Sequence, residues 1–171
     1  MGIFDKLFNK KEKNEASSLE SNEVRVFFPK EVFSTIEFKQ DDLPGIGVIT
    51  SSLKEFKQRE VFGYHLSIMF HYEDLIENGM PSQKEREETD PFCEYLEDLL
   101  KGDNPEYPNG LFLGRFTWNK TRELIWKIHD PEIADKELKR IIESEEHPRP
   151  FDYRMDPDSN WELSKWHLGE S

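Results

Sequence analysis

The sequence is poor in cysteine and in long hydrophobic runs. Cys93 is its one cysteine, so no disulfide can form within the chain, and a lone thiol is typical of a reducing compartment. No apolar run approaches the ~20 residues that a membrane-spanning helix needs, and no hydrophobic region of a signal peptide is found. Gly2 follows Met1, but Lys6 stands where a myristoylation signal has Ser or Thr. We therefore expect a cytoplasmic protein without a transmembrane segment.

Basic residues are also scarce. There are 23 Lys and Arg against 36 Asp and Glu, so the formal net charge is −13. Residues 73–106 alone hold twelve acidic and three basic residues, a net of −9. Because nucleic-acid binding depends on Lys and Arg that displace counterions, direct nucleic-acid binding is not expected. An acidic surface can instead attract a protein partner with a basic surface, or it can simply keep the protein soluble.

No motif of a catalytic or metal-binding site is present, neither Gly-x-Ser-x-Gly, nor a phosphate-binding loop, nor His-Glu-x-x-His. His65 and His71 share a strand face but are about 20 Å apart, too far to bind one metal ion. His65 and His129 are better placed, on neighbouring strands with Glu123, yet a zinc site needs three or four ligands and no third can be assigned. We predict no catalytic residue, metal or cofactor, and we keep one polar group as a candidate for a small enzyme: His65, His129, Arg115 and Glu123.

Aromatic residues, in contrast, are plentiful at 13% of the chain, with thirteen Phe. Such rings can build a core, so we expect one folded domain over residues 23–171. Residues 1–22 are expected to form a flexible tail. Its first eleven residues place apolar side chains on one helical face, which leaves open a peripheral membrane contact or a frayed end. These side chains belong to Ile3, Phe4, Leu7 and Phe8.

The clearest element is a strand over Phe62–Tyr72. Its even positions are all apolar or aromatic, which is typical of a sheet with one buried face. Before it, residues 23–60 are expected to form a β-rich extension of the main sheet. Three strand-like patterns indicate this extension, at Val24–Phe28, Thr35–Phe38 and Ile46–Thr50, and Asp41-Asp42 and Pro44-Gly45 indicate a turn before the third.

Two helices are expected after this strand. Asp90-Pro91 and Asp130-Pro131 each have the cap-then-proline sequence of a helix start, which predicts helices over 91–101 and 131–143. Ser82 and Glu85 have capping-box spacing, so residues 82–90 could also join the first helix. In the second helix we expect buried apolar side chains at Ala134, Leu138, Ile141 and Ile142.

Three strands complete the pattern. Leu111–Trp118 and Thr121–His129 form a hairpin around Asn119-Lys120, and a last strand follows at Phe151 to Met155. Residues 61–157 therefore have the order β-α-β-β-α-β, which predicts an α+β, ferredoxin-like antiparallel sheet with two helices on one face. Residues 158–171 form a tail that contains Trp161 and Trp166.

The hairpin register predicts which side chains lie on each face of the sheet. A two-residue turn puts Leu111 and Leu113 under the helices and leaves three aromatic residues on the opposite face. These are Phe112, Phe116 and Trp118. They would form a protein-binding patch if exposed, or lie beneath residues 24–50 or the tryptophan tail. On the first helix the acidic residues off the apolar stripe are expected to face water and to bind a partner: Glu94, Glu97 and Asp98.

Several runs resemble a known bacterial family. GMPSQKEREE from Gly79, LEDLL from Leu96 and LGRFTWNKTRELIWKIHDPE from Leu113 resemble family 695 of the domains of unknown function, over roughly residues 45–165. This resemblance implies no activity and no catalytic residues. The chain is similar, more distantly, to acidic inhibitors of ribonuclease E, which implies a protein that acts by binding an enzyme.

These observations predict a non-enzymatic, acidic protein-binding or regulatory module whose partner carries a basic surface. Two alternatives stay open. One is a small enzyme that uses the open sheet face, and the other is an immunity-type antitoxin that neutralises a basic toxin through its acidic helix.

Overall fold

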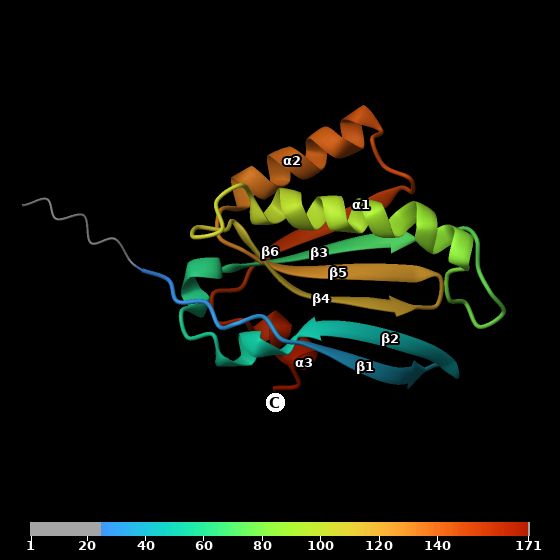
Figure 1. Cartoon of the computed structure of the whole chain (residues 1–171), viewed down its shortest axis with the longest axis horizontal. Helices are drawn as coiled ribbons and strands as arrows, with labels where there is room; N and C mark the ends of the chain where they lie inside the picture. The colour runs from blue at the N-terminus through green and yellow to red at the C-terminus, as the bar shows by residue number, and fades with distance from the viewer. Residues whose placement is uncertain (1–24, 171) are drawn as a thin grey trace, which may run out of the picture.

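The computed structural model describes residues 25–170 (Figure 1). The predictions for residues 1–22, including membrane contact through residues 1–11, lie outside this range. Within it, no helix is long and apolar enough to cross a membrane.

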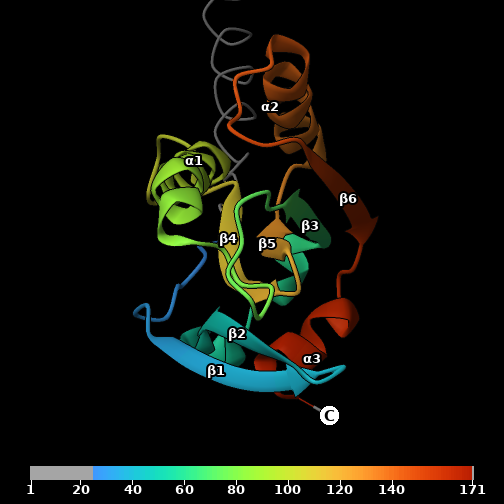
Figure 2. The same cartoon turned by 90° about the vertical axis from the view of Figure 1, so that its right-hand side faces the viewer.

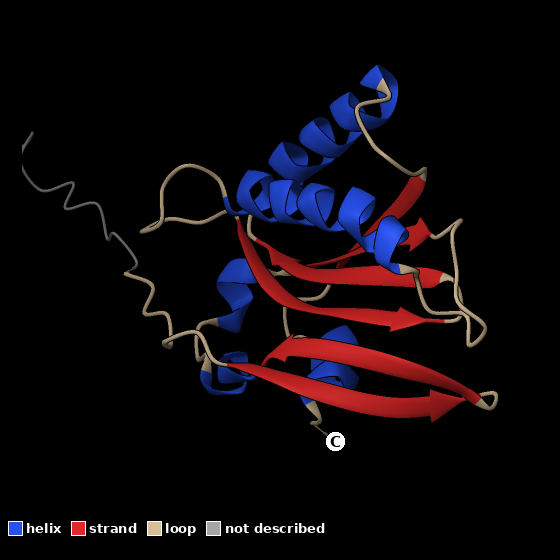
Figure 3. Ribbon diagram, turned by 45° about the vertical axis from the view of Figure 1, so that its right-hand side comes forward, coloured by secondary structure: helices blue, strands red, loops and turns tan. Residues whose placement is uncertain are grey.

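A six-stranded antiparallel sheet forms the centre of the structure. The strands are β1 (Phe33–Gln40), β2 (Leu43–Thr50), β3 (Tyr64–His71), β4 (Gly110–Trp118), β5 (Thr121–Ile128) and β6 (Phe151–Pro157). Their order across the sheet is β1-β2-β4-β5-β3-β6, with β1 at one edge (Figure 3). The predicted α+β class is confirmed. The sheet has six strands rather than four because β2 pairs with β4 and β1 pairs with β2.

Strands β1 and β2 form a hairpin within the predicted extension. Its turn is Asp41-Asp42, where both residues have positive φ, as the tightest hairpin turns require. Pro44 and Gly45 already belong to β2. The predicted strand at Val24–Phe28 is wrong over its described part, which is irregular, although Val26 and Phe28 pack against buried side chains.

Helices α1 (Gln83–Lys101) and α2 (Pro131–Ser144) cover one face of the sheet. The side chains of Leu66, Ile68 and Phe70 lie fully buried beneath them, as the alternating pattern predicted. Phe62 was also expected beneath the helices, but it lies on the opposite face of the sheet. It precedes β3 and belongs to a short 3₁₀ helix, η2 (Arg59–Phe62). The period-two pattern therefore gave the face correctly and extended the strand too far.

The start of α1 is at Ser82 rather than at Asp90. The Ser82 hydroxyl accepts a hydrogen bond from the backbone N–H of Glu85, and Pro91 lies inside the helix. Helix α2 begins as predicted, because the Asp130 carboxylate accepts the N–H groups of Glu132 and Ile133. The predicted burial of Ile142 is wrong, since its side chain is exposed.

The opposite face of the sheet is covered by two separate segments (Figure 2). One is residues 51–62, which contain η1 (Ser51–Glu55) and η2. The other is the C-terminal tail, with η3 (Glu162–Ser164) and α3 (Lys165–Leu168). Trp161 and Leu168 from the tail are fully buried against Ile125 of β5. The face is therefore covered, and the tryptophan tail is one of the predicted covers. The prediction for residues 24–50 is wrong over residues 33–50, because these form β1 and β2 of the sheet itself.

A β-bulge in β4 changes which side chains lie on each face. Phe112 pairs with Trp126 and Gly114 pairs with Ile125, so Leu113 is one extra residue in β4. Because one extra residue reverses the alternation, the residues before the bulge lie on the faces opposite to those predicted.

The bulge accounts for three corrections in the hairpin. Phe112 lies under the helices, whereas Leu111 and Leu113 lie on the opposite face. Arg115 lies between the bulge and the turn, so the bulge does not change its face. It pairs with Leu124, a residue of the core beneath α1 and α2, and is therefore on the helix side rather than on the open face expected for the polar group. Phe116 keeps its predicted face.

Candidate functional site

The structure does not bring together the four polar residues singled out for a small enzyme. His65 pairs across the sheet with Lys127, and Glu123 lies farther along, opposite Met69. His129 follows β5, where its Nδ1 atom is 2.7 Å from the Val61 carbonyl oxygen. Arg115 is on the other face of the sheet. The group therefore offers no shared site.

His65 belongs to a buried polar cluster under the C-terminal tail. Its Nδ1 atom is 3.2 Å from the Ser164 hydroxyl oxygen. Burial lowers the pKa of His65 to about 4, and the positive charges of Lys127 and His167 act in the same direction. A buried, uncharged histidine of this kind holds the tail on the sheet rather than serving a solvent-facing reaction. Among residues 25–170, no group of three or more His, Cys, Asp or Glu could hold a metal ion.

The three aromatic residues expected on the open face do not form one patch. Phe112 and Phe116 are both buried, on opposite faces of the sheet. Phe116 also contacts the rings of Trp166 and His167. Trp118 is half-buried, and its indole N–H donates to the Gln40 carbonyl oxygen at 3.1 Å.

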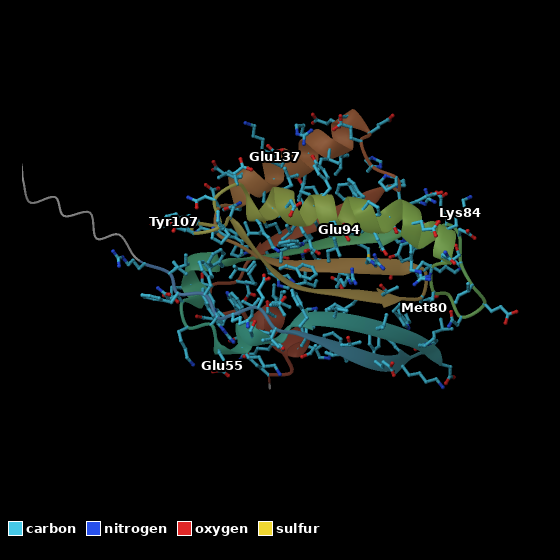
Figure 4. All side chains as sticks on the ribbon, in the orientation of Figure 1. Glu55, Met80, Lys84, Glu94, Tyr107 and Glu137 are labelled. Atoms are coloured by element: carbon cyan, nitrogen blue, oxygen red, sulfur yellow. The ribbon has the colours of Figure 1, made fainter. Side chains whose placement is uncertain are left out.

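The acidic residues of α1 differ in their surroundings. Glu94 and Asp98 are exposed (Figure 4 labels Glu94), and neither makes an ion pair with a described residue. Glu97 is half-buried, with its carboxylate 3.9 Å from Nζ of Lys101. Burial raises the pKa of Glu97, and Lys101 opposes that shift. The charges of Glu94 and Asp98 are therefore not balanced by an ion pair within residues 25–170.

Sequence reasoning missed a cleft of about 430 Å³ between α1, the turn before it, β2 and β4. We call it the arginine cleft, because three guanidinium groups line it beside one carboxylate. These charged residues are Arg86, Arg115, Arg122 and Asp90, and the remaining lining residues are Ile46, Val48, Ile76, Met80, Pro81 and Thr117.

Arg122 forms the fixed base of the arginine cleft. Its side chain is buried, its Nε atom donates to the Thr117 hydroxyl, and its Nη1 atom donates to Asp90 and to the Cys93 sulfur. The guanidinium group lies 5.4 Å from the centre of the Tyr72 ring. Burial raises the pKa of the Cys93 thiol although Arg122 lies against it, so the thiol stays protonated.

A second cleft, of about 550 Å³, lies at the other end of α1. It is lined mainly by apolar groups of the segment before β1 and by the loop after α1, including Phe28, Pro105 and Pro108. At its rim, the Nζ atom of Lys101 is 4.0 Å from the Glu31 carboxylate. No charged group is buried within it, so it lacks the fixed polar anchors of the arginine cleft.

The model of a family of unknown function, DUF695, matches residues 36–165, which is more than half of the chain. The chain belongs to the DUF695 family. No curated protein and no solved structure matches it. The DUF695 match includes both the arginine cleft and the acidic side of α1. The run that first indicated DUF695 contains Arg115 and Arg122. The sequence therefore contained two of the three arginines, but it did not show that they line one cleft.

Proposed function

We propose that this protein is a non-enzymatic module that binds a partner protein with a basic surface through the exposed acidic side of α1. The observation that carries this proposal is the state of Glu94 and Asp98. Both side chains are exposed and neither forms an ion pair with any residue that the structure describes. Their charges are not used in holding the fold together.

The spacing of these charges supports the proposal. Asp90, Glu94 and Asp98 follow one another at intervals of four residues, which makes them neighbours on the helix surface. Like charges at this spacing destabilise a helix by about 0.2–0.5 kcal/mol per pair. Asp90 is neutralised by Arg122, but the pair of Glu94 and Asp98 has no such compensation. A basic partner would supply it.

One exposed tyrosine lies beside the acidic residues. Tyr95 follows Glu94 on α1, and its hydroxyl accepts a hydrogen bond from Arg140 of α2, whereas Tyr107 lies in the loop after the helix, apart from Glu94 (Figure 4). Tyrosine is enriched in protein interfaces because it combines a large apolar ring with a polar end. The combination of acidic and tyrosine side chains favours a protein partner over a purely solvating surface.

The proposal includes the finer predictions made from the sequence. We infer that β4, β5, β3 and β6 with α1 and α2 form a ferredoxin-like unit, to which β1 and β2 are added; the adjacency of these four strands supports this. Two kinds of partner would fit: a basic toxin, or an enzyme that is inhibited by this protein in the way that ribonuclease E is inhibited by its acidic inhibitors. A cytoplasmic location is part of the same proposal.

Charge reversal on α1 tests the proposal. The purified chain is used as bait in a lysate at increasing salt, and the retained proteins are quantified by mass spectrometry. We expect a basic protein to be retained at low salt, released by about 0.5 M salt, and lost with the double variant Glu94→Lys/Asp98→Lys. The matched control is Glu55→Lys/Glu143→Lys, which changes the net charge equally at exposed positions away from this side of α1.

Each result separates the proposal from its alternatives. Retention by the control but not by the α1 variant, with unchanged circular dichroism of both, supports it. Equal retention by the two variants overturns the assignment to α1. If the α1 variant unfolds, the charges are structural and the proposal loses its main support.

A further inference from the structure

We propose that the arginine cleft binds a small organic oxyanion, a phosphate or carboxylate group attached to an apolar body. The site adjoins the acidic side of α1 and shares Asp90 with it, but the inference does not rest on the proposed function. It rests on three observations: the two guanidinium groups of the cleft that lack an ion pair within residues 25–170, the fixed position of Arg122, and the apolar walls.

Two of the three guanidinium groups have no structural partner. Arg115 is half-buried and Arg86 is exposed, and neither forms an ion pair or a side-chain hydrogen bond with a described residue. Both line the same cleft as Arg122. A partly buried guanidinium group loses hydration, and an anion would restore its hydrogen bonds.

The charge of the cleft is opposite to that of the protein. Three guanidinium groups and the Asp90 carboxylate give the cleft a net of +2, whereas the chain carries −13. Positive groups gathered in a concave site with apolar walls raise the local potential for anions. Guanidinium groups bind phosphate and carboxylate with paired hydrogen bonds, which gives this site its chemical preference.

Arg122 is held in place before any ligand arrives. Its Nε and Nη1 atoms are fixed by Thr117, Asp90 and Cys93, while its Nη2 atom has no hydrogen bond to a described residue. Because Nη1 already donates to the Asp90 carboxylate of α1, Nη2 is the donor that remains for a ligand. A donor that is already oriented loses little entropy when it binds a ligand.

The remaining wall of the cleft is apolar and firmly attached. Ile76, Met80 and Pro81 belong to the turn before α1, and Ile46 and Val48 come from β2. The turn is joined to the β4–β5 hairpin, because the N–H of Lys120 donates to the Gly79 carbonyl oxygen at 2.8 Å. A cleft of about 430 Å³ with this lining suits a small molecule with an apolar body beside its anionic group.

Calorimetric titration of the full chain with phenyl phosphate tests the inference, with benzoate, inorganic phosphate and benzyl alcohol as comparison ligands. We expect phenyl phosphate or benzoate to bind with a Kd below about 1 mM, inorganic phosphate to bind about tenfold more weakly, and benzyl alcohol not to bind. The stronger of the two aromatic anions identifies the oxyanion. No heat from either at about 10 mM overturns the inference.

Substitutions locate the binding to the cleft. Arg115→Gln and Arg86→Gln should each weaken the aromatic anion about tenfold, and Arg115→Lys should retain part of the affinity. The matched control is Arg154→Gln, which removes the same charge from an exposed position on β6. Ile46→Ala should weaken the aromatic anion without affecting inorganic phosphate. If Arg115→Gln and Arg154→Gln have equal effects while both melt as the parent protein does, the binding is not in the cleft.

Discussion

The Nζ atom of Lys127 lies 2.8 Å from Oδ2 of Asp158, and both side chains are almost completely buried. The same ammonium group donates to the Asp158 carbonyl oxygen at 3.1 Å and lies 5.2 Å from the centre of the Trp161 ring. Burial lowers the pKa of Lys127, and Asp158 opposes that shift. The pair joins β5, in the middle of the sheet, to the tail that covers it.

Removing one member of this pair should destabilise the protein strongly. Asp158→Ala leaves a buried ammonium group without its counterion, and we expect a loss of about 3–5 kcal/mol in the free energy of unfolding, measured by urea denaturation. The double variant Lys127→Met/Asp158→Ala should recover much of this loss, because it removes the uncompensated charge. If the double variant is as unstable as the single one, the role of the pair is geometric rather than electrostatic.

The buried His65 should make stability depend on pH. Its folded-state pKa of about 4 lies below the unfolded value of 6.5, so the unfolded state binds more protons between these values. The stability from uncharged His65 is therefore fully present above pH 6.5 and is lost as the pH falls toward 4. The size of the effect is at most about 3 kcal/mol.

The pH effect is measured by urea denaturation at pH 7 and pH 4.5. His65→Asn should reduce the difference in unfolding free energy between the two pH values. His71→Asn is the control, because His71 is on the same strand but exposed. Carboxylates contribute to both variants equally, so the difference between the variants isolates His65. Equal pH dependence in the two would contradict the assignment.

Leu66 provides a direct test of the helix-side core. It has no exposed surface and lies on β3 beneath the helices. Leu66→Ala should cost about 2–5 kcal/mol in unfolding free energy, because it leaves a cavity that the surrounding core cannot fill. Leu163→Ala, at a half-exposed position of η3, should cost far less. A loss below about 1 kcal/mol for Leu66→Ala would show that the core assignment is wrong.

The parts of the fold that were predictable depend on local physics. The alternation in β3 and the Asp130 cap of α2 are both readable within a few residues, and the structure confirms them. The Leu113 bulge was not readable, because an extra residue in one strand leaves no local mark and still reverses the faces of its neighbours. The start of α1 could not be decided from the sequence, because Ser82 with Glu85 and Asp90 with Pro91 both have the pattern of a helix start. The structure shows one helix that begins after Ser82 and contains Pro91.

The candidate site was less predictable than the fold. Arg122 and Asp90 are 32 residues apart in the sequence, and only the packing of α1 on the β4–β5 hairpin brings them together. Arg115 was identified as a polar candidate but was grouped with residues of the opposite face, although its pairing with Leu124 puts it on the helix side. The exposed state of Glu94 and Asp98 followed from helical periodicity alone, since both lie off the apolar stripe.

Glu85 links the stability of the fold to the arginine cleft. Its side chain has no exposed surface, and its carboxylate accepts hydrogen bonds from the backbone N–H groups of Glu73 and Asp74 and from Arg149. Although burial acts to raise the pKa of Glu85, these partners hold it below its ordinary value. Glu85 therefore ties the start of α1 to the segment that leads into the cleft wall.

We expect Glu85→Ala to lower the free energy of unfolding by about 3 kcal/mol, because Arg149 and two N–H groups lose their acceptor. The stabilisation that the ionised Glu85 carboxylate gives to the fold is present above its unfolded pKa of 4.5 and is lost as the pH falls below it. The difference in unfolding free energy between Glu85→Ala and the parent protein should therefore shrink toward about pH 3. Because the segment Glu73-Asp74, which leads into the turn at Ile76–Pro81, loses its acceptor, Glu85→Ala should also weaken phenyl phosphate binding at temperatures where the variant is folded. Glu88→Ala is the control, since its carboxylate also accepts from Arg149 but is exposed and does not reach the backbone of the turn. If Glu85→Ala and Glu88→Ala bind phenyl phosphate equally well, the turn keeps its shape without Glu85, and the cleft wall is fixed by the Gly79–Lys120 hydrogen bond instead.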